Sequence, residues 1–147
     1  MKWQTELDLA VATARQAGEK LRQIARGAVT SDQGRDVKHL ADVESEKAII
    51  ESLRAGSPHP LLTEESGAHG RISNDAPAWI VDPLDGTLNY SRDIPLCAVS
   101  IALWRGAEPL LGVVYDFNRD ELFSGAAGLG AWLNDTPISP SGVAETE

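Results

Sequence analysis

The stretch that decides the fold of this chain reads Trp79-Ile80-Val81-Asp82-Pro83-Leu84-Asp85-Gly86-Thr87. Its apolar start predicts a buried strand, and two carboxylates spaced by two residues follow it directly. Mg2+ prefers carboxylate, carbonyl and phosphate oxygens, and Asp82 and Asp85 supply two carboxylates where the strand ends. A short helix that begins near Gly86 would add free backbone N–H groups, which attract anions. The stretch therefore predicts that a metal ion and a phosphate group meet at one place.

The same residues also fit ordinary turn chemistry. Asp caps helices, Pro restricts φ and Gly tolerates positive φ, so an Asp-x-x-Asp spacing alone favours a turn over a metal site. Two further acidic segments change this balance. Glu64 and Glu65 end a second strand-like run, and Asp36 and Asp42 flank the start of a predicted helix. Taken singly, the glutamates indicate a solvated surface pair and Asp42 a helix N-cap.

Composition indicates one globular domain with its own core. The chain has 147 residues, 42% of them hydrophobic, and no apolar run approaches the ~20 residues that span a bilayer. The N-terminus enters a mixed-charge helical pattern without signal-peptide features, so we expect a cytoplasmic protein. Cys97 is the only cysteine, which excludes an intrachain disulfide and disfavours a thiolate zinc site. Its apolar neighbours predict a buried side chain.

The net charge of −9 argues against nucleic acid polymers and anionic membranes as partners. It also opposes a phosphorylated substrate, unless divalent cations compensate the charge at the site. We expect a small phosphorylated metabolite as the partner. An acidic chain that binds such a metabolite favours a metal site. The three histidines, His39, His59 and His69, lie in polar or loop-like surroundings, where we expect solvent exposure and not metal ligation.

Hydrophobic periodicity predicts two N-terminal helices. Apolar residues recur every three or four positions over 4–26, and Gly27 is a natural stop. The polar, breaker-rich segment 30–36 predicts an exposed loop. A second helix is expected to start near Asp42 and to stop at 55–58.

The remainder of the chain is dominated by short strand-like runs. They lie between turn residues at 60–63, 78–81, 97–104, 110–115, 121–124, 131–133 and 137–138. Two helices followed by closely connected strands predict an α+β fold, in which the helices cover one face of a mainly antiparallel sheet. The acidic end, 144–147, is expected to be unstructured.

The order of the acidic segments resembles the inositol monophosphatase family of Mg2+-dependent, lithium-sensitive phosphatases. The matching segments are Asp36, Asp42, Glu64-Glu65-Ser66 and Asp82-Pro83-Leu84-Asp85-Gly86-Thr87-Leu88-Asn89-Tyr90. Three later segments continue the resemblance to about Ser141: 94–103, 111–116 and 128–134. The resemblance implies the N-terminal part of a layered αβαβα sugar-phosphatase fold. A metal-binding domain would occupy 1–141, and an acidic tail 142–147.

The resemblance further implies a metal site with named ligands. Glu64 would bind the first metal and orient the attacking water, Asp82 would bridge two metals, and Asp85 would bind the second. The Leu84 carbonyl would complete the first site. Glu65 would support the ligands from behind, and it would exchange roles with Glu64 if the register differs by one. The implied cofactor is Mg2+, about two to three ions per site, with Mn2+ as an alternative and Li+ as an inhibitor.

For the phosphate and the nucleophile, the resemblance implies a second group of residues. Asp85, Gly86 and Thr87 would face the substrate phosphate, the last two through backbone N–H groups. The Thr87 hydroxyl, held by Asp42, would help to activate the water. The implied reaction is hydrolysis of a phosphomonoester, most like inositol 1-phosphate to inositol and phosphate. The same fold leaves open a 3′-phosphoadenosine nucleotide, fructose bisphosphate or histidinol phosphate as substrate, or an inactive metal-binding fragment.

The chain departs from the family in its length. Members that resemble it run to roughly twice its length, and their second half carries a Trp-Asp motif that supplies a further metal ligand. None of the four tryptophans here precedes an aspartate, so we expect a truncated chain that lacks the C-terminal domain. A sheet face left open in this way would drive self-association, and the resemblance implies a homodimer.

Overall fold

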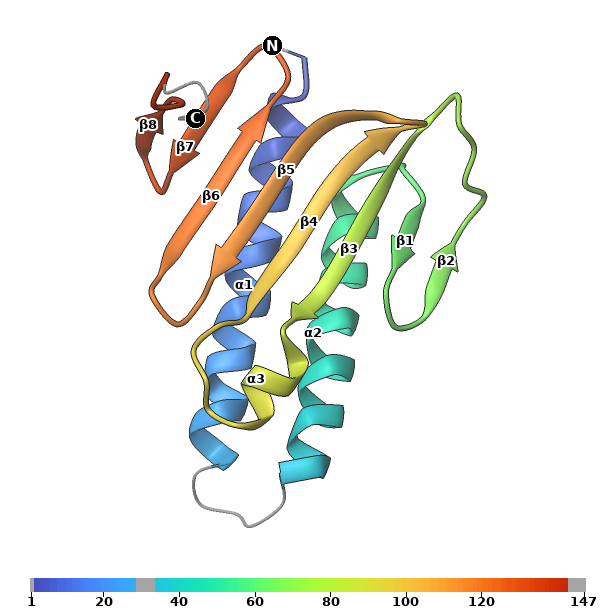
Figure 1. Ribbon diagram of the computed structural model, residues 1–147. Helices are drawn as coiled ribbons and strands as arrows, with labels where there is room; N and C mark the ends of the chain where they lie inside the picture. The colour runs from blue at the N-terminus through green and yellow to red at the C-terminus, as the bar shows by residue number, and fades with distance from the viewer. Residues whose placement is uncertain (1, 29–33, 143–147) are drawn as a thin grey trace, which may run out of the picture.

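The computed structural model describes residues 2–28 and 34–142, in which two long helices lie behind one sheet (Figure 1). The helices are α1 (Gln4–Ala28), α2 (Gly34–Gly56) and the short α3 (Thr87–Ser91). The strands are β1 (Leu61–Thr63), β2 (Gly67–His69), β3 (Pro77–Asp85), β4 (Ala98–Arg105), β5 (Glu108–Asp116), β6 (Glu121–Ala126), β7 (Gly130–Leu133) and β8 (Thr136–Ile138).

The eight strands form a single sheet in the order β2-β1-β3-β4-β5-β6-β7-β8. Every neighbouring pair is antiparallel except β1 and β3, which run parallel. From β3 onward each strand pairs with the next along the chain; α3 lies in the connection between β3 and β4, and short turns join the later strands. The predicted α+β fold with helices on a mainly antiparallel sheet is confirmed.

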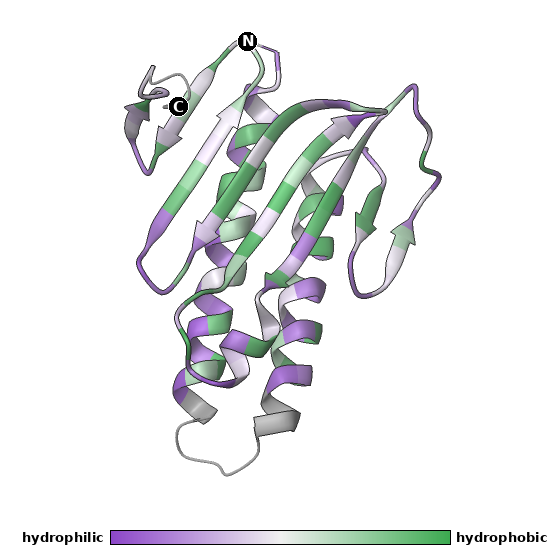
Figure 2. Cartoon of the chain, in the orientation of Figure 1, coloured by the Kyte–Doolittle hydropathy of each residue, from purple (hydrophilic) through white to green (hydrophobic). Residues whose placement is uncertain are grey.

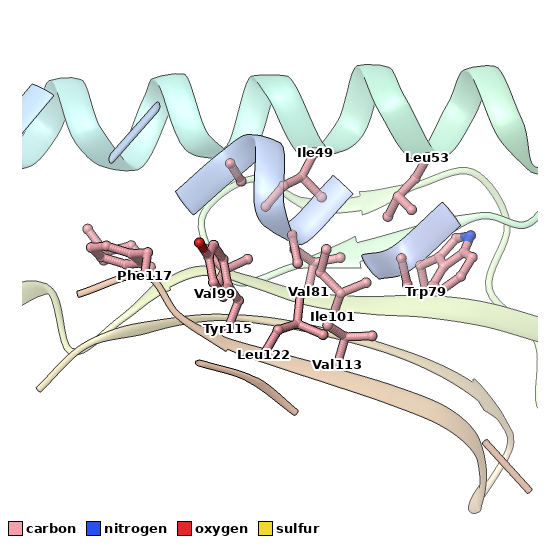
Figure 3. Close-up of a cluster of buried hydrophobic side chains, with 14 of the residues drawn as sticks. Ile49, Leu53, Trp79, Val81, Val99, Ile101, Val113, Tyr115, Phe117 and Leu122 are labelled. Atoms are coloured by element: carbon pink, nitrogen blue, oxygen red, sulfur yellow. The ribbon is translucent and has the colours of Figure 1, made fainter. Parts of the chain in front are cut away.

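The core lies between the helices and one face of the sheet. Figure 3 shows Ile49 and Leu53 of α2 pointing toward Val81 and Ile101 on the strands, and all four side chains are buried. On α1 the buried face is largely alanine, which permits a close approach to the sheet. At Gly18 a Cβ atom would lie 2.5 Å from a ring carbon of Tyr115, so glycine is required for this approach.

The opposite face of the sheet carries apolar side chains that nothing covers within the described residues. Residues alternate between the two faces of a strand, so the neighbours of buried core residues face outward. Ile80, Val114 and Phe123 are 42%, 44% and 41% exposed, whereas Val81 and Val113 are 2% and 1% exposed. The central strands are accordingly rich in hydrophobic residues, although only one face is buried (Figure 2).

The structure corrects the predicted start of the second helix. α2 begins at Gly34 and not near Asp42, so Asp42 lies inside the helix and is not an N-cap. The predicted loop 30–36 is wrong for 34–36, which belong to α2, while 30–33 lie outside the described residues. Between 35 and 55 the sequence contains no Gly or Pro that would stop a helix, so an interior Asp can resemble a cap.

Smaller differences concern segment ends. α1 continues through Gly27 to Ala28, because a glycine lowers helix propensity without preventing a helix. The strand β2 was not predicted, since its three residues are too few for a periodic pattern. The predicted acidic tail lies outside the described residues from 143 onward. No helix in the described part of the chain is long and apolar enough to cross a bilayer.

Candidate active site

Asp82 and Asp85 lie at a β-bulge near the end of β3. Asp82 pairs with Ser100 and Asp85 with Ala98, so β3 advances by three residues where β4 advances by two. β3 therefore carries one extra residue at this point. Pro83 suits the bulge because it has no N–H to contribute to the sheet. The Leu84 N–H donates to Asp82 Oδ1 at 3.2 Å, whereas Asp85 is exposed. The strand predicted to end at Val81 therefore continues, and both carboxylates belong to its bulged end.

Glu64 and Glu65 lie in the turn between β1 and β2. The Glu64 N–H donates to the Val81 carbonyl at 3.1 Å, which extends the parallel pairing of β1 with β3 and brings Glu64 beside the bulge. Both glutamate side chains are exposed. A hydrogen bond in which protonated Glu65 donates to the Glu64 carboxylate, together with desolvation and the charge of Asp42, raises the pKa of Glu65 to about 7. The turn therefore concentrates negative charge.

Asp42 reaches the same place from α2. Its side chain is buried, and desolvation raises its pKa, with a further upward contribution from the charge of Glu64. Desolvation likewise raises the pKa of Asp82, and the charges of Asp85, Glu64 and Asp42 raise it further. The fold therefore brings carboxylates from three separate segments, a helix, a turn and a strand end, close enough for their charges to interact. The clustering agrees with the order of acidic segments in the sequence.

The chemistry of this donor set fits a hard divalent cation. Carboxylates and a backbone carbonyl are the ligands that Mg2+ prefers, and carboxylates in one place repel one another unless a cation compensates them. Across residues 2–28 and 34–142, no three His, Cys, Asp or Glu side chains converge closely enough to form a ready-made metal site. Because Glu64 and Asp85 are exposed, their side chains have room to move toward a cation.

Gly86 and α3 follow the carboxylates directly. Gly86 adopts φ 87°, and a Cβ atom there would lie 2.6 Å from the Leu96 carbonyl oxygen. The predicted short helix near Gly86 is confirmed as α3. The Tyr90 hydroxyl donates to the Leu21 carbonyl of α1 at 2.7 Å, and α3 also packs against α2. Thr87, which is half-buried, therefore has a backbone anchored to both long helices.

Gly86→Ala is expected to lower the free energy of unfolding by about 2 kcal/mol or more, because it combines positive-φ strain with a clash against backbone. Urea unfolding followed by circular dichroism measures this loss. Gly67→Ala is the matched control, since Gly67 has φ 77° with nothing within 4 Å of its Cβ position. The control should lose only about 1 kcal/mol. Equal losses in both variants would contradict the clash.

Two of the histidines lie near the carboxylates: His69 Nε2 is 2.6 Å from the Ser66 hydroxyl, and the charge of His39 lowers the pKa of Asp42. His39 is exposed as predicted, but the exposure expected for His59 and His69 is wrong, since both are half-buried. His59 packs near the Trp79 ring, with ring centres 6.4 Å apart, and His69 belongs to β2. Cys97 is buried as predicted.

Two residues behind the carboxylates were missed by sequence reasoning. The Ser45 hydroxyl donates to the Pro83 carbonyl at 2.7 Å, and the Glu46 carboxylate accepts hydrogen bonds from the β1–β2 turn. Their spacing of three and four residues from Asp42 places all three on one face of α2. That spacing was the available signal, but it indicates a site only if residues 42–46 are known to be helical.

The chain is similar in sequence to inositol monophosphatases from several organisms. Rat inositol monophosphatase 1 is 36% identical over 145 residues, which cover 95% of this chain and 52% of the rat protein. Inositol-1-monophosphatase of Synechocystis is 37% identical over 148 residues, covering 98% of this chain and 51% of that protein. The chain thus spans about half the length of the curated relatives it matches.

Solved structures agree with the sequence relatives. Inositol monophosphatase from Anabaena superposes with a TM-score of 0.82 at 40% identity, covering 99% of this chain and 53% of that one. Staphylococcal IMPase-II has been solved with bound inositol monophosphate and with bound 2′AMP, at TM-scores of 0.76 and 0.77 and identities of 26% and 29%. The two alignments cover 93% and 92% of this chain, and 50% of the staphylococcal chain in each case. The inositol monophosphatase family model matches residues 2–147, and the chain therefore belongs to the inositol monophosphatase family.

Proposed function

We propose that this chain carries the metal- and phosphate-binding part of a Mg2+-dependent phosphomonoesterase that hydrolyses inositol 1-phosphate to inositol and phosphate. The observation that supports this most strongly is the gathering of Asp42, Glu64 and Asp82 from three segments, where the charge of Glu64 raises the pKa of both aspartates. An acidic cluster of this kind needs a cation before a phosphate ester can approach. In this proposal residues 1–141 form the N-terminal metal-binding domain, and 142–147 are a tail.

The proposed ligands are carboxylates and one carbonyl. Glu64, Asp82 and the Leu84 carbonyl would hold one Mg2+, and Asp82 and Asp85 a second. When bound, the ions lower the pKa of coordinated water and compensate charge on the phosphoryl group. Mn2+ is the alternative ion, and Li+ is proposed to inhibit. Glu65, beside Glu64, would support the ligand turn, and Asp82 is already oriented by the Leu84 N–H.

The protein groups proposed for catalysis surround these ligands. Glu64 would orient the attacking water, and Thr87 with Asp42 would accept its proton on the way to bulk solvent. The packing of α3 on α2 supports this pairing, because it places the helix of Thr87 beside that of Asp42. Asp85, Gly86 and Thr87 would position the phosphate, with the Gly86 conformation exposing the following backbone N–H groups.

The choice of substrate is a finer proposal than the family membership. Inositol monophosphate and 2′AMP both bind to staphylococcal IMPase-II, which supports phosphomonoesters on a ring alcohol as the substrate class. A 3′-phosphoadenosine nucleotide, fructose bisphosphate and histidinol phosphate are therefore the alternatives. A second candidate function is metal binding without catalysis, by an inactive fragment. This candidate is favoured because the chain covers only about half the length of its relatives.

Phosphate release from inositol 1-phosphate tests this proposal. We expect release with Mg2+, none after the metal is removed by EDTA, and inhibition by Li+. Mg2+ binding measured by calorimetry without any turnover would instead support the metal-binding fragment. A chain that neither binds Mg2+ nor releases phosphate would contradict both functions.

We further propose that a second copy of the chain covers the outer face of the sheet, giving a homodimer. Ile80, Val114 and Phe123 on that face are each more than 40% exposed, and exposed apolar surface of this kind promotes association. Light scattering across a concentration series measures the mass, and a single-chain mass throughout would contradict the dimer. A cytoplasmic location stays a prediction from the sequence.

A further inference from the structure

Glu46 of α2 is buried beneath the turn that carries Glu64. It is 9% exposed, and its Oε1 atom accepts three hydrogen bonds from that turn. The donors are the Thr63 hydroxyl at 2.5 Å, the Ser66 N–H at 3.0 Å and the Ser66 hydroxyl at 2.7 Å. Bonds to a charged acceptor are stronger than neutral ones, and here they hold both sides of Glu64 and Glu65.

Ser45, the preceding residue of α2, holds the other acidic segment. Its buried hydroxyl donates to the Pro83 carbonyl at 2.7 Å, within the bulge that separates Asp82 from Asp85. This carbonyl is therefore held from outside its own strand. Two consecutive residues of one helix thus contact the two segments that carry the proposed ligands.

We propose that Ser45 and Glu46 are positioning residues, which set the separation between the Glu64 turn and the Asp82–Asp85 bulge from a single turn of α2. This inference rests on the proposed function, since the two segments matter together only if both hold a metal ion. Neither residue needs to contact the ion: Glu46 acts through the Thr63–Ser66 turn, and Ser45 through the Pro83 carbonyl. A helix is a suitable frame because its residues move little relative to one another.

The reason for such positioning lies in the exposure of the ligands. The Glu64 and Asp85 side chains are exposed, so binding a metal ion costs the conformational entropy of their side chains. Holding the backbone at Thr63, Ser66 and Pro83 removes the backbone part of that cost before the ion arrives. Loss of such supporting contacts typically weakens metal binding by about 10–100-fold.

Mn2+ binding, followed by electron paramagnetic resonance on the full chain, tests this inference. We expect Glu46→Ala to weaken Mn2+ binding by about 10–100-fold, and Ser66→Ala and Ser45→Ala by several-fold each. Glu46→Gln should be less severe than Glu46→Ala, because its amide oxygen still accepts from the turn. Glu51→Ala is the matched control, since Glu51 is an exposed glutamate of the same helix.

The variants separate positioning from simple loss of charge. Ser45→Ala and Ser66→Ala keep every charge, so a weaker Mn2+ affinity in them supports positioning. Unchanged affinity in both serine variants, or equal weakening in Glu46→Gln and Glu46→Ala, overturns the inference. Thermal melting without metal shows whether each variant is folded at the titration temperature. If Glu46→Ala fails to fold, the serine variants and Glu46→Gln still decide.

Failure of the proposed function would look different in the same titration. The proposed function, and the inference with it, is overturned if the wild-type chain binds no Mn2+ at millimolar concentration. The same holds if the wild type and Asp82→Asn bind Mn2+ with equal affinity. Asp82-dependent Mn2+ binding that is insensitive to Ser45, Glu46 and Ser66 overturns only the positioning role.

Discussion

Replacing Asp82 by asparagine is expected to abolish Mg2+-dependent phosphate release and to weaken Mn2+ binding by roughly 100-fold or more. Asp82 is the proposed bridging ligand, and an amide contributes neither its charge nor its second anionic oxygen. The Leu84 N–H can still donate to the amide oxygen, so the bulge should keep its shape. Calorimetry and a phosphate-release assay measure the two effects.

The same substitution is expected to stabilise the metal-free protein. The folded-state pKa of Asp82 is raised above its unfolded value, chiefly by desolvation. This contribution to stability is fully present below the unfolded pKa and is lost as the pH rises through the folded one. Asparagine stays neutral, so at neutral pH the metal-free variant should melt at a higher temperature than the wild type.

Mg2+ should reverse that order. A ligand at 100 times its dissociation constant stabilises the folded state by about 2.7 kcal/mol, and only the wild type should gain this. Asp75→Asn is a matched control, because Asp75 lies on an exposed loop. Equal Mg2+ stabilisation of wild type and Asp82→Asn would contradict the assignment of Asp82 as a ligand.

Trp79→Ala is expected to lower the free energy of unfolding by about 4 kcal/mol, the largest stability effect of a single substitution that we predict. Trp79 is fully buried, and Figure 3 shows it on the sheet below Leu53 of α2. Its ring nitrogen also donates to the Ser57 hydroxyl at 3.1 Å, and truncation removes this bond. Small domains are stable by only about 5–15 kcal/mol, so this loss is a large share of the total.

Trp104→Ala is the control that shows whether the loss of stability in Trp79→Ala comes from the burial of Trp79 or from the removal of any tryptophan. Trp104 lies on the neighbouring strand β4 but is only half-buried, so its loss should cost less than about 2 kcal/mol. Urea unfolding followed by circular dichroism compares the two variants at equal protein concentration. Comparable losses in both would show that the helix-covered face of the sheet does not dominate stability.

Much of the fold was predictable because its signals are local. Periods of three to four residues identified the first helix, and strand-like runs between turn residues identified seven of the strands, leaving out β2. The β-bulge and the start of α2 were not predictable in this way. A bulge depends on pairing with another strand, and Asp42 looks the same at a helix start as inside a helix.

The sequence by itself determined the acidic residues, their order along the chain and the α+β class, because residue identity and hydrophobic period are properties of the chain alone. Only the tertiary structure decided that Asp42, Glu64 and Asp82 influence one another, because α2, the β1–β2 turn and the end of β3 meet only through packing. It also decided the contacts of Ser45 and Glu46, which are ordinary helix residues until the sheet folds against them.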